Sequence, residues 1–208
     1  SLGWRRALLP LTFVSATSML LGQADIVLLG FFRAQSEVGV YGAAVRVATL
    51  AGFGLIAVNM VASPLLARLH AENSRAQLQT ALYSAARLAL GFTVAVGLML
   101  AWQADRVLAL FGAEFSVGAD VLRILLVGQA VNAAAGSAGA FMVMDGAERQ
   151  AARKLGGVVL LNALANLVLI PLYGMHGAAL ATAASVALWS VVGALWVLRA
   201  HGLRSSVF

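Results

Sequence analysis

Six apolar runs, each long enough to cross a lipid bilayer as an α-helix, fill most of the sequence. A transmembrane helix needs about 20 predominantly apolar residues. The runs cover roughly residues 8–32, 39–67, 79–102, 119–144, 154–173 and 176–199. Together they predict an all-α integral membrane protein that crosses the bilayer six times.

The composition excludes a soluble domain. Hydrophobic residues make up 62% of the chain and charged residues 11%, whereas soluble domains have about 45–50% and about 25%. A soluble fold of this length cannot hide so much apolar surface. The net charge is +6, but the basic residues are scattered singly between apolar runs, so we expect no nucleic-acid partner.

The longest polar connection, residues 103–118, contains a segment with helical character. Residues 105–111 predict a short helix at the membrane interface, which Gly112 would end. The chain begins with Ser1 rather than Met. We therefore expect residues 1–208 to be a single transmembrane unit from a longer chain.

The distribution of lysine and arginine between the connections predicts the orientation. Such residues are enriched in cytoplasmic loops. With the N-terminus inside, the inner side holds Arg5, Arg6, Arg68, Arg75, Arg149, Arg153, Lys154, Arg199 and Arg204, and the outer side holds Arg33, Arg106 and Arg123. Nine basic residues against three predict that both termini are cytoplasmic, as in a multi-pass protein of the bacterial inner membrane.

Three ionisable residues lie inside the apolar runs. Asp25, Arg46 and Arg87 would be costly at membrane depth unless they have a partner or a function. Asp25 and Arg46 should lie at similar depth on adjacent antiparallel helices, and one interpretation is a structural ion pair between them. Alternatively, Asp25 binds a coupling cation or proton and the arginines line a transport cavity. Arg87 can also extend its side chain to the inner phosphates.

Uncharged polar residues inside the runs offer a second set of candidates. Gln129 and Asn132 lie beside a stretch of small residues, 133–140, so cavity lining is a secondary interpretation that is stronger for them than for the other polar residues. Asn162 and Asn166 share one helix face. Hydrogen bonding between helices is the default interpretation for all four residues.

Catalytic and metal-binding patterns are weak. His70, His176 and His201 are far apart in the sequence and close to the predicted interfaces, so no metal site is expected. The segment around Ser137 departs from the G-x-S-x-G motif at its first residue and lies inside an apolar run. We assign no catalytic residue and no cofactor, and we do not expect an enzyme.

Several stretches, in order along nearly the whole chain, carry a family resemblance. They read DIVLLG at 25–30, VGVYGAAVR at 38–46, VLALFGAEF at 107–115, GQAVN at 128–132, MDGAER at 144–149 and NALANLVLIPLYGMHGAALAT at 162–182. This pattern resembles the C-terminal six-helix half of polysaccharide-type flippases. These proteins form the oligosaccharide-lipid branch of the superfamily that also contains the multidrug and toxin extrusion transporters, the MOP superfamily.

The resemblance implies a protein of twelve helices in two lobes that alternate between inward-open and outward-open states. Its cargo would be an undecaprenyl-pyrophosphate-linked oligosaccharide, moved to the outer leaflet for O-antigen, capsule or exopolysaccharide assembly. Arg46 and Arg87 would suit the pyrophosphate, with Gln129 and Asn132 as further cavity residues. Asp25 would couple transport to a proton or sodium gradient.

This chain departs from the family pattern in offering only one lobe, so the N-terminal lobe of the same chain is an expected partner, beside membrane lipids. Three other interpretations stay open. They are a multidrug or cation antiporter of the same superfamily, a membrane-embedded glycan polymerase or ligase, and a non-transporting scaffold.

Overall fold

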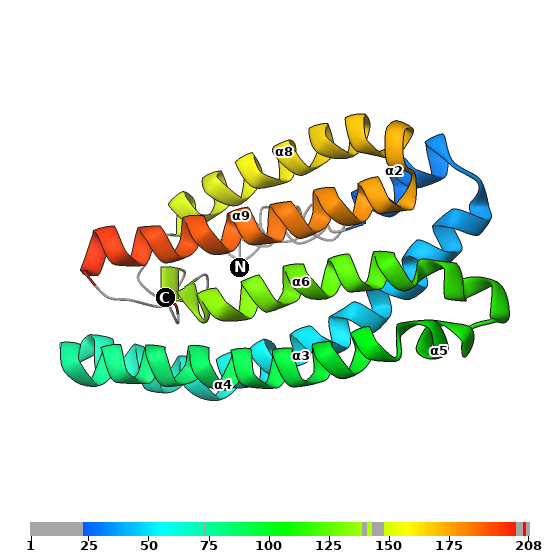
Figure 1. Cartoon of the computed structure of the whole chain (residues 1–208). Helices are drawn as coiled ribbons and strands as arrows, with labels where there is room; N and C mark the ends of the chain where they lie inside the picture. Colours follow the sequence, from blue (N-terminus) through cyan, green and yellow to red (C-terminus); the bar gives the residue numbers. More distant parts are fainter. Residues whose placement is uncertain (1–22, 73, 139–140, 143–147, 203–205, 207–208) are drawn as a thin grey trace, which may run out of the picture.

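The computed structural model describes residues 23–72, 74–138, 141–142, 148–202 and 206, with only the backbone of Glu148 and Arg149. Within this part of the chain every regular element is a helix (Figure 1). The elements are α2 (Ala24–Phe32), α3 (Gln35–Ala71), α4 (Arg75–Trp102), α5 (Ala104–Ala109), the 3₁₀-helix η1 (Ala113–Gly118), α6 (Ala119–Ala135), α8 (Glu148–Tyr173) and α9 (Met175–His201).

Five helical segments of the described chain are long and apolar enough to cross a membrane. They are Gln35–Ala71, Arg75–Trp102, Ala113–Ala135, Gln150–Tyr173 and Met175–His201. These segments confirm the predicted membrane-spanning helical character over most of the chain. Most of the first predicted span, 8–32, lies outside the described residues, and only its end is seen as α2. Six crossings therefore stay a prediction.

The fourth predicted span is shorter than expected. We expected a continuous helix over 119–144, but α6 ends at Ala135. Gly136 has a φ of 66°, a left-handed conformation that glycine adopts without the steric cost a Cβ would impose. The side chain of Ser137 then donates a hydrogen bond to Oδ1 of Asn59 on α3, at 2.5 Å. The break thus turns a polar group toward a neighbouring helix.

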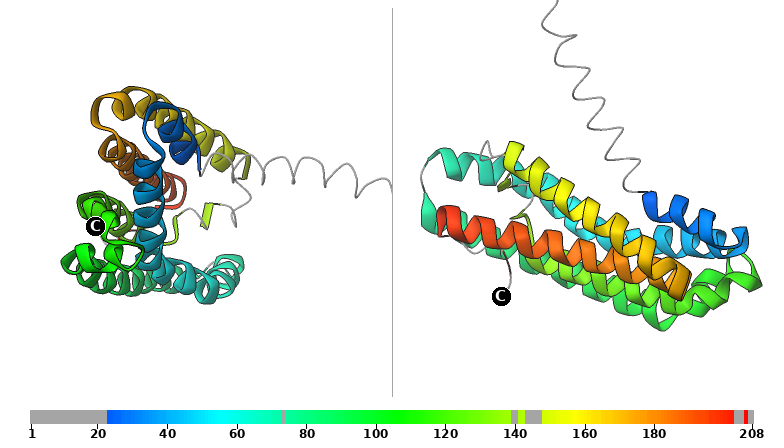
Figure 2. Two further views of the ribbon diagram at one scale, coloured as in Figure 1. Left: turned by 90° about the vertical axis from the view of Figure 1, so that its right-hand side faces the viewer. Right: turned by 90° about the horizontal axis from the view of Figure 1, so that it is seen from above.

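The long helices pack side by side in an elongated bundle. In Figure 1, α3 runs obliquely past α6 to reach α4, while α9 lies between α6 and α8. The two views of Figure 2 also place α8 beside α9 and the short α2 close to α8. At 37 residues, α3 is about 55 Å long, so it must tilt or extend beyond a hydrocarbon core of about 30 Å.

Small residues allow these helices to approach closely. A Cβ added to Gly128 on α6 would lie 3.0 Å from Cα of Ala183 on α9, and Ala44, Ala48 and Ala179 are buried in the main apolar cluster. Without a hydrophobic driving force between helices in lipid, such contacts supply much of the packing energy. These small residues pack helices together, which is the ordinary role expected for them.

The turn between α8 and α9 gives a test of this packing. A Cβ on Gly177 would lie 2.1 Å from the carbonyl oxygen of Leu169, so Gly177→Ala should cost about 1–3 kcal/mol or more. We expect lower thermal stability of the full-length protein in detergent. The matched control is Gly157→Ala on α8, where the added methyl group meets nothing within 4 Å. Equal melting temperatures for the two variants would contradict the packing described.

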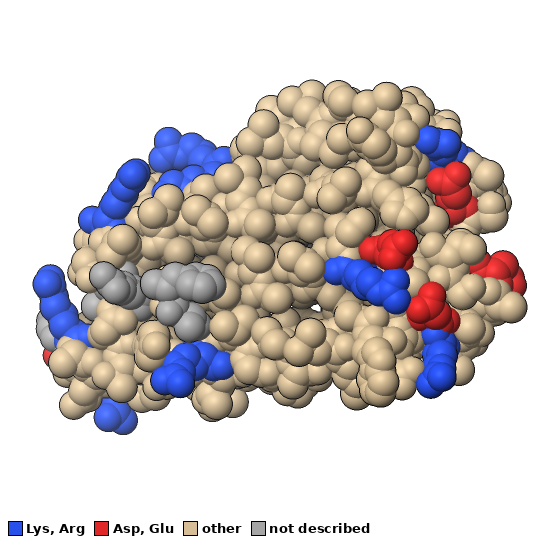
Figure 3. Space-filling view, in the orientation of Figure 1, with Lys and Arg blue, Asp and Glu red and all other residues tan. Residues whose placement is uncertain are grey.

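Charged side chains gather at the two ends of the molecule and leave an apolar band between them (Figure 3). Among side chains that the structure describes, one end carries Arg68, Arg75, Arg153, Lys154, Arg199 and Glu72, and the other carries Arg33, Arg106, Arg123, Glu37, Asp105, Glu114 and Asp120. The first end is strongly basic and the second has slightly more acids than bases. This contrast agrees with the loop charges that predict a cytoplasmic first end.

The predicted interfacial helix is present at the acidic end. It spans Ala104–Ala109 rather than 105–111, and the chain turns before Gly112, which has a φ of 140°. Arg123 of α6 ties this region together. Its guanidinium donates hydrogen bonds to Asp120 at 2.7 Å and to Asp105 at 3.1 Å. These pairs are exposed, so each adds little stability.

Candidate functional site

Asp25 lies at the meeting point of α2, α3 and α9, with 7% of its surface exposed. The hydroxyl of Tyr41 on α3 donates a hydrogen bond to Oδ2 of Asp25 at 2.5 Å. The hydroxyl of Thr182 on α9 donates to the same oxygen at 3.1 Å. A buried carboxylate therefore joins three helices through two uncharged donors, and we call Asp25, Tyr41 and Thr182 the carboxylate cluster.

The predicted Asp25–Arg46 ion pair is wrong. Asp25 takes its hydrogen bonds from the carboxylate cluster, whereas Arg46 is exposed on α3 and forms no ion pair with a described carboxylate. The reason is the direction of the side chains. Tyr41 and Arg46 are five residues apart, which separates them by about 140° around a helix axis. The face of α3 that meets α2 therefore carries Tyr41.

A second polar cluster lies between α8 and α9. The amide nitrogen of Asn162 donates to the hydroxyl of Ser185 at 3.1 Å. The amide nitrogen of Asn166 donates to Asn162 at 3.0 Å. Oδ1 of Asn166 is buried and has no hydrogen-bond partner in the described part of the chain. A buried polar atom without a partner is costly.

The two clusters lie at the same level of the bundle. Because α8 and α9 are antiparallel and Asn162 pairs with Ser185, Asn166 lies beside the turn of α9 that carries Thr182. Thr182 in turn contacts Asp25. The carboxylate and the two hydroxyls of the cluster therefore lie at about the same level of the bundle as the amide of Asn166. Oxygen-rich sets of this kind suit a proton or a hard cation.

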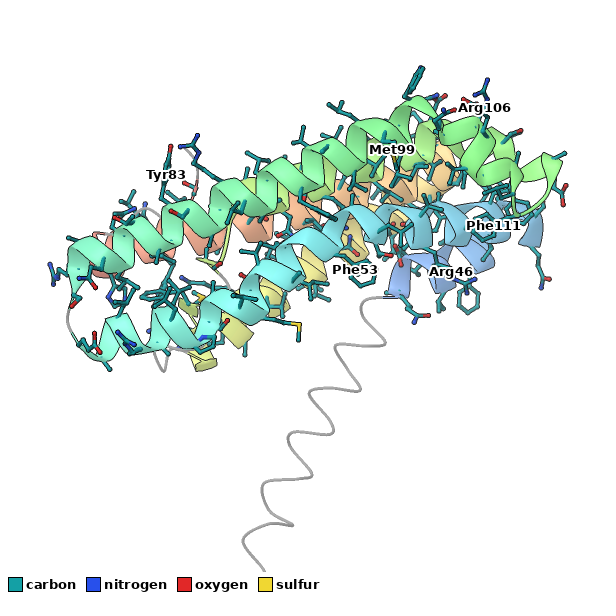
Figure 4. All side chains as sticks on the ribbon, turned by 90° about the horizontal axis from the view of Figure 1, so that it is seen from below. Arg46, Phe53, Tyr83, Met99, Arg106 and Phe111 are labelled. Atoms are coloured by element: carbon teal, nitrogen blue, oxygen red, sulfur yellow. The ribbon has the colours of Figure 1, made fainter. Side chains whose placement is uncertain are left out.

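The two candidate cavity arginines do not converge. The guanidinium of Arg87 lies over the ring of Tyr83 on α4, 5.5 Å from its centroid. Figure 4 shows Tyr83 and Arg46 at opposite edges of the bundle. Arg46 shares its exposed face of α3 with Phe53 and Met60, which follow at intervals of seven residues and are 54% and 75% exposed. The structure therefore separates Arg46 from Arg87.

Gln129 and Asn132 both lie between helices of the bundle. The side chain of Gln129 lies against Gly52 of α3, where an added Cβ would be 2.9 Å from Oε1 of Gln129. Oδ1 of Asn132 accepts a hydrogen bond from Ser190 of α9 at 3.1 Å. Both side chains are half-buried. For Asn132, the default interpretation of hydrogen bonding between helices is confirmed.

Two of the three histidines are neighbours in space, contrary to their separation in the sequence. The rings of His70 and His201 lie 5.7 Å apart, and both contact the ring of Phe141. The ends of α3 and α9 bring them together at the basic end of the bundle. No group of three potential metal ligands is found among the described residues.

Sequence reasoning missed the roles of Tyr41 and Thr182 as donors to Asp25, and the buried oxygen of Asn166 that has no hydrogen-bond partner in the described part of the chain. Tyr41 and Thr182 carry no charge. Scattered hydroxyl residues in apolar runs do not reveal from the sequence whether their side chains contact one another in the fold. One signal in the sequence pointed to Tyr41. A short aspartate at membrane depth cannot reach water on its own and needs a donor, and Tyr41 is the nearest strong donor on the following helix.

A buried polar region within a multi-pass helical bundle is typical of membrane transporters. Comparison with known families agrees, because the MatE family profile matches residues 10–168. The chain belongs to the MatE family. This match confirms the superfamily predicted from the sequence and points to a transporter rather than an enzyme.

One relative carries a more specific name. The "Probable low-salt glycan biosynthesis flippase Agl15" of Haloferax volcanii is 29% identical over 188 residues, which cover 88% of this chain and 38% of that protein. The chain thus spans less than half the length of this relative. This distant relative confirms the resemblance to glycan flippases. No solved structure matches the chain.

Proposed function

We propose that the chain is one lobe of a flippase that moves lipid-linked oligosaccharides across the membrane. Membership of the MatE family supports transport, and the name of the Haloferax volcanii relative supports a glycan cargo. The observation that carries the proposal is the buried Asp25, which meets three helices without a cationic partner among the described residues. A second lobe, supplied by the rest of a longer chain, would complete the cavity.

The carboxylate cluster is the coupling site in this proposal. An ionised carboxylate away from water is costly unless it binds a cation or takes up a proton. Binding of either one at Asp25 would change the packing between α2, α3 and α9, because α3 and α9 each donate a hydrogen bond to an oxygen that α2 carries. Oδ1 of Asn166, which lacks a hydrogen-bond partner among the described residues, would add a neutral ligand. Ion binding would then bias the equilibrium between two lobe orientations.

Arg46 is the cargo-binding residue in this proposal. Its side chain is exposed on a largely apolar face of α3, with Phe53 as its neighbour in Figure 4. A guanidinium at membrane depth binds a phosphate or pyrophosphate well, because its donors match the oxygens in pairs. An undecaprenyl-pyrophosphate-linked unit moved from the cytoplasmic to the outer leaflet would supply that group.

Complementation tests the substrate class. We expect the full-length gene to restore surface glycan in cells that lack their own flippase. We also expect it to leave their resistance to toxic organic cations unchanged, because Arg46 would repel a cationic drug. Surface glycan is measured by antibody or lectin binding, and resistance by growth. Resistance gained without any surface glycan would instead support a multidrug or cation antiporter.

A further inference from the structure

A pocket lies at the basic end of the bundle, lined by residues from the first part of α8 and the last part of α9. These two helix segments lie side by side in Figure 1. Its volume is about 390 Å³, and its lining consists of Lys154, Val192, Leu195, Trp196, Arg199 and Ala200. On α9, the spacing of the lining residues places them on one helix face. Neither the carboxylate cluster nor Arg46 contributes to this pocket.

Two cations face the pocket without an acidic partner. The ammonium of Lys154 lies 5.7 Å from the centroid of the Trp196 ring, and Arg199 comes from the opposite helix. Among the side chains that the structure describes, neither cation pairs with a carboxylate. Two like charges on one small pocket repel each other, and a bound anion removes that repulsion. The pocket therefore suits an anionic group.

Trp196 forms a fixed wall of the pocket. Its indole nitrogen donates to Oε1 of Gln150 on α8 at 3.0 Å, and its ring lies 5.6 Å from that of His201. Tryptophan favours the interface between hydrocarbon and headgroups. The position of Trp196 therefore places the two cations at the depth of lipid phosphates.

An apolar strip continues from the pocket along α9. The exposed side chains of Leu188, Val191, Leu195 and Leu198 form this strip, with 39–50% of each exposed. A free phosphate ion would gain nothing from such a surface, whereas the acyl chains of a lipid would cover it. The charge and the apolar strip together identify an amphiphilic anion.

We propose that this pocket binds the phosphate headgroup of an anionic membrane phospholipid, with the acyl chains lying along the apolar strip. Lys154 and Arg199 would hold the phosphate from two sides. Basic pockets between helices on the cytoplasmic side of membranes bind such lipids, and the cytoplasmic leaflet carries anionic lipids that attract them. This inference concerns a lipid of the surrounding membrane and does not depend on the glycan cargo.

Native mass spectrometry of the full-length protein tests the proposal, with phosphatidylglycerol and phosphatidylcholine as the two probes. We expect wild-type protein to retain phosphatidylglycerol about tenfold more strongly or better, since each basic residue near an anionic lipid contributes a several-fold gain. The double variant K154Q/R199Q should lose this preference. The control R68Q/R75Q removes the same charge from the same end and should keep it.

Four results would overturn the proposal. Equal retention of the two lipids by wild-type protein would do so without any variant. Unchanged preference in a folded K154Q/R199Q protein would place the site elsewhere. Displacement of phosphatidylglycerol by inorganic phosphate would mark a simple anion site, and preferential displacement by undecaprenyl pyrophosphate would assign the pocket to the flippase cargo instead.

Discussion

Asp25→Asn in the full-length protein is expected to abolish ion-coupled transport while leaving the protein folded in the membrane. Asparagine keeps an oxygen that accepts hydrogen bonds from Tyr41 and Thr182, so the packing of α2 against α3 and α9 should survive. The variant loses only the negative charge, and with it the ability to bind a proton or cation. We expect surface glycan to fall at least about tenfold. A tenfold loss corresponds to about 1.4 kcal/mol, and a hydrogen bond to a charged group contributes about 1.5–3 kcal/mol.

Asp25→Ala is the matched structural control. It removes the shared acceptor of the Tyr41 and Thr182 hydroxyls. These hydroxyls lie 3.3 Å apart and can still pair with each other, so one donor loses its partner at a cost of about 1–3 kcal/mol. We expect a lower protein level for this variant, measured by immunoblot of membranes. If Asp25→Asn lowers the protein level as much as Asp25→Ala and restores glycan in proportion to that level, Asp25 is a structural residue.

Tyr41→Phe separates the two roles further. This change removes one donor to Oδ2 of Asp25 but keeps the carboxylate and the ring. We expect transport to continue with a changed requirement for the coupling ion. The ion concentration that gives half the maximal rate, measured in proteoliposomes under a sodium or a pH gradient, should shift. If the half-maximal ion concentration is unchanged under both gradients, Tyr41 plays no part in ion coupling.

The crossings of the bilayer were predictable because the thickness of the hydrocarbon core sets a minimum length for every apolar run. The five spans in the described chain follow that rule. The end of α6 was not predictable in this way. The segment from Ala133 to Ala140 is small and apolar, so the change of backbone direction at Gly136 leaves no trace in hydropathy.

The partners of the polar residues were harder to predict, for a different reason. A helix that is apolar on every side gives no periodic signal for the face that meets its neighbour. Depth in the membrane alone suggested Arg46 as the partner of Asp25. The orientation of α3 about its own axis instead directs Tyr41 toward Asp25. Likewise, His70 and His201 are far apart in the sequence, and only the packing of α3 and α9 at one end of the bundle makes them neighbours.

Arg46→Ala is expected to weaken cargo transport in the full-length protein without lowering its stability. The side chain of Arg46 is exposed on α3 and has no carboxylate partner among the described residues, so its removal breaks no ion pair in the bundle. Loss of a charge-assisted hydrogen bond to a pyrophosphate costs about 1.5–3 kcal/mol, or about 10- to 100-fold in affinity. We therefore expect a raised KM for lipid-linked oligosaccharide in proteoliposomes, with a smaller change in the maximal rate.

Two further arginine variants serve as controls for the Arg46→Ala prediction. Arg75→Ala removes an exposed arginine at the basic end and should leave transport unchanged. Arg87→Ala should have a smaller effect than Arg46→Ala, because the guanidinium of Arg87 is already held over the ring of Tyr83. If Arg46→Ala retains the wild-type KM, the exposed face of α3 does not bind the anionic group of the cargo. An equal rise in KM for all three variants would instead show a general effect of surface charge, which salt screens.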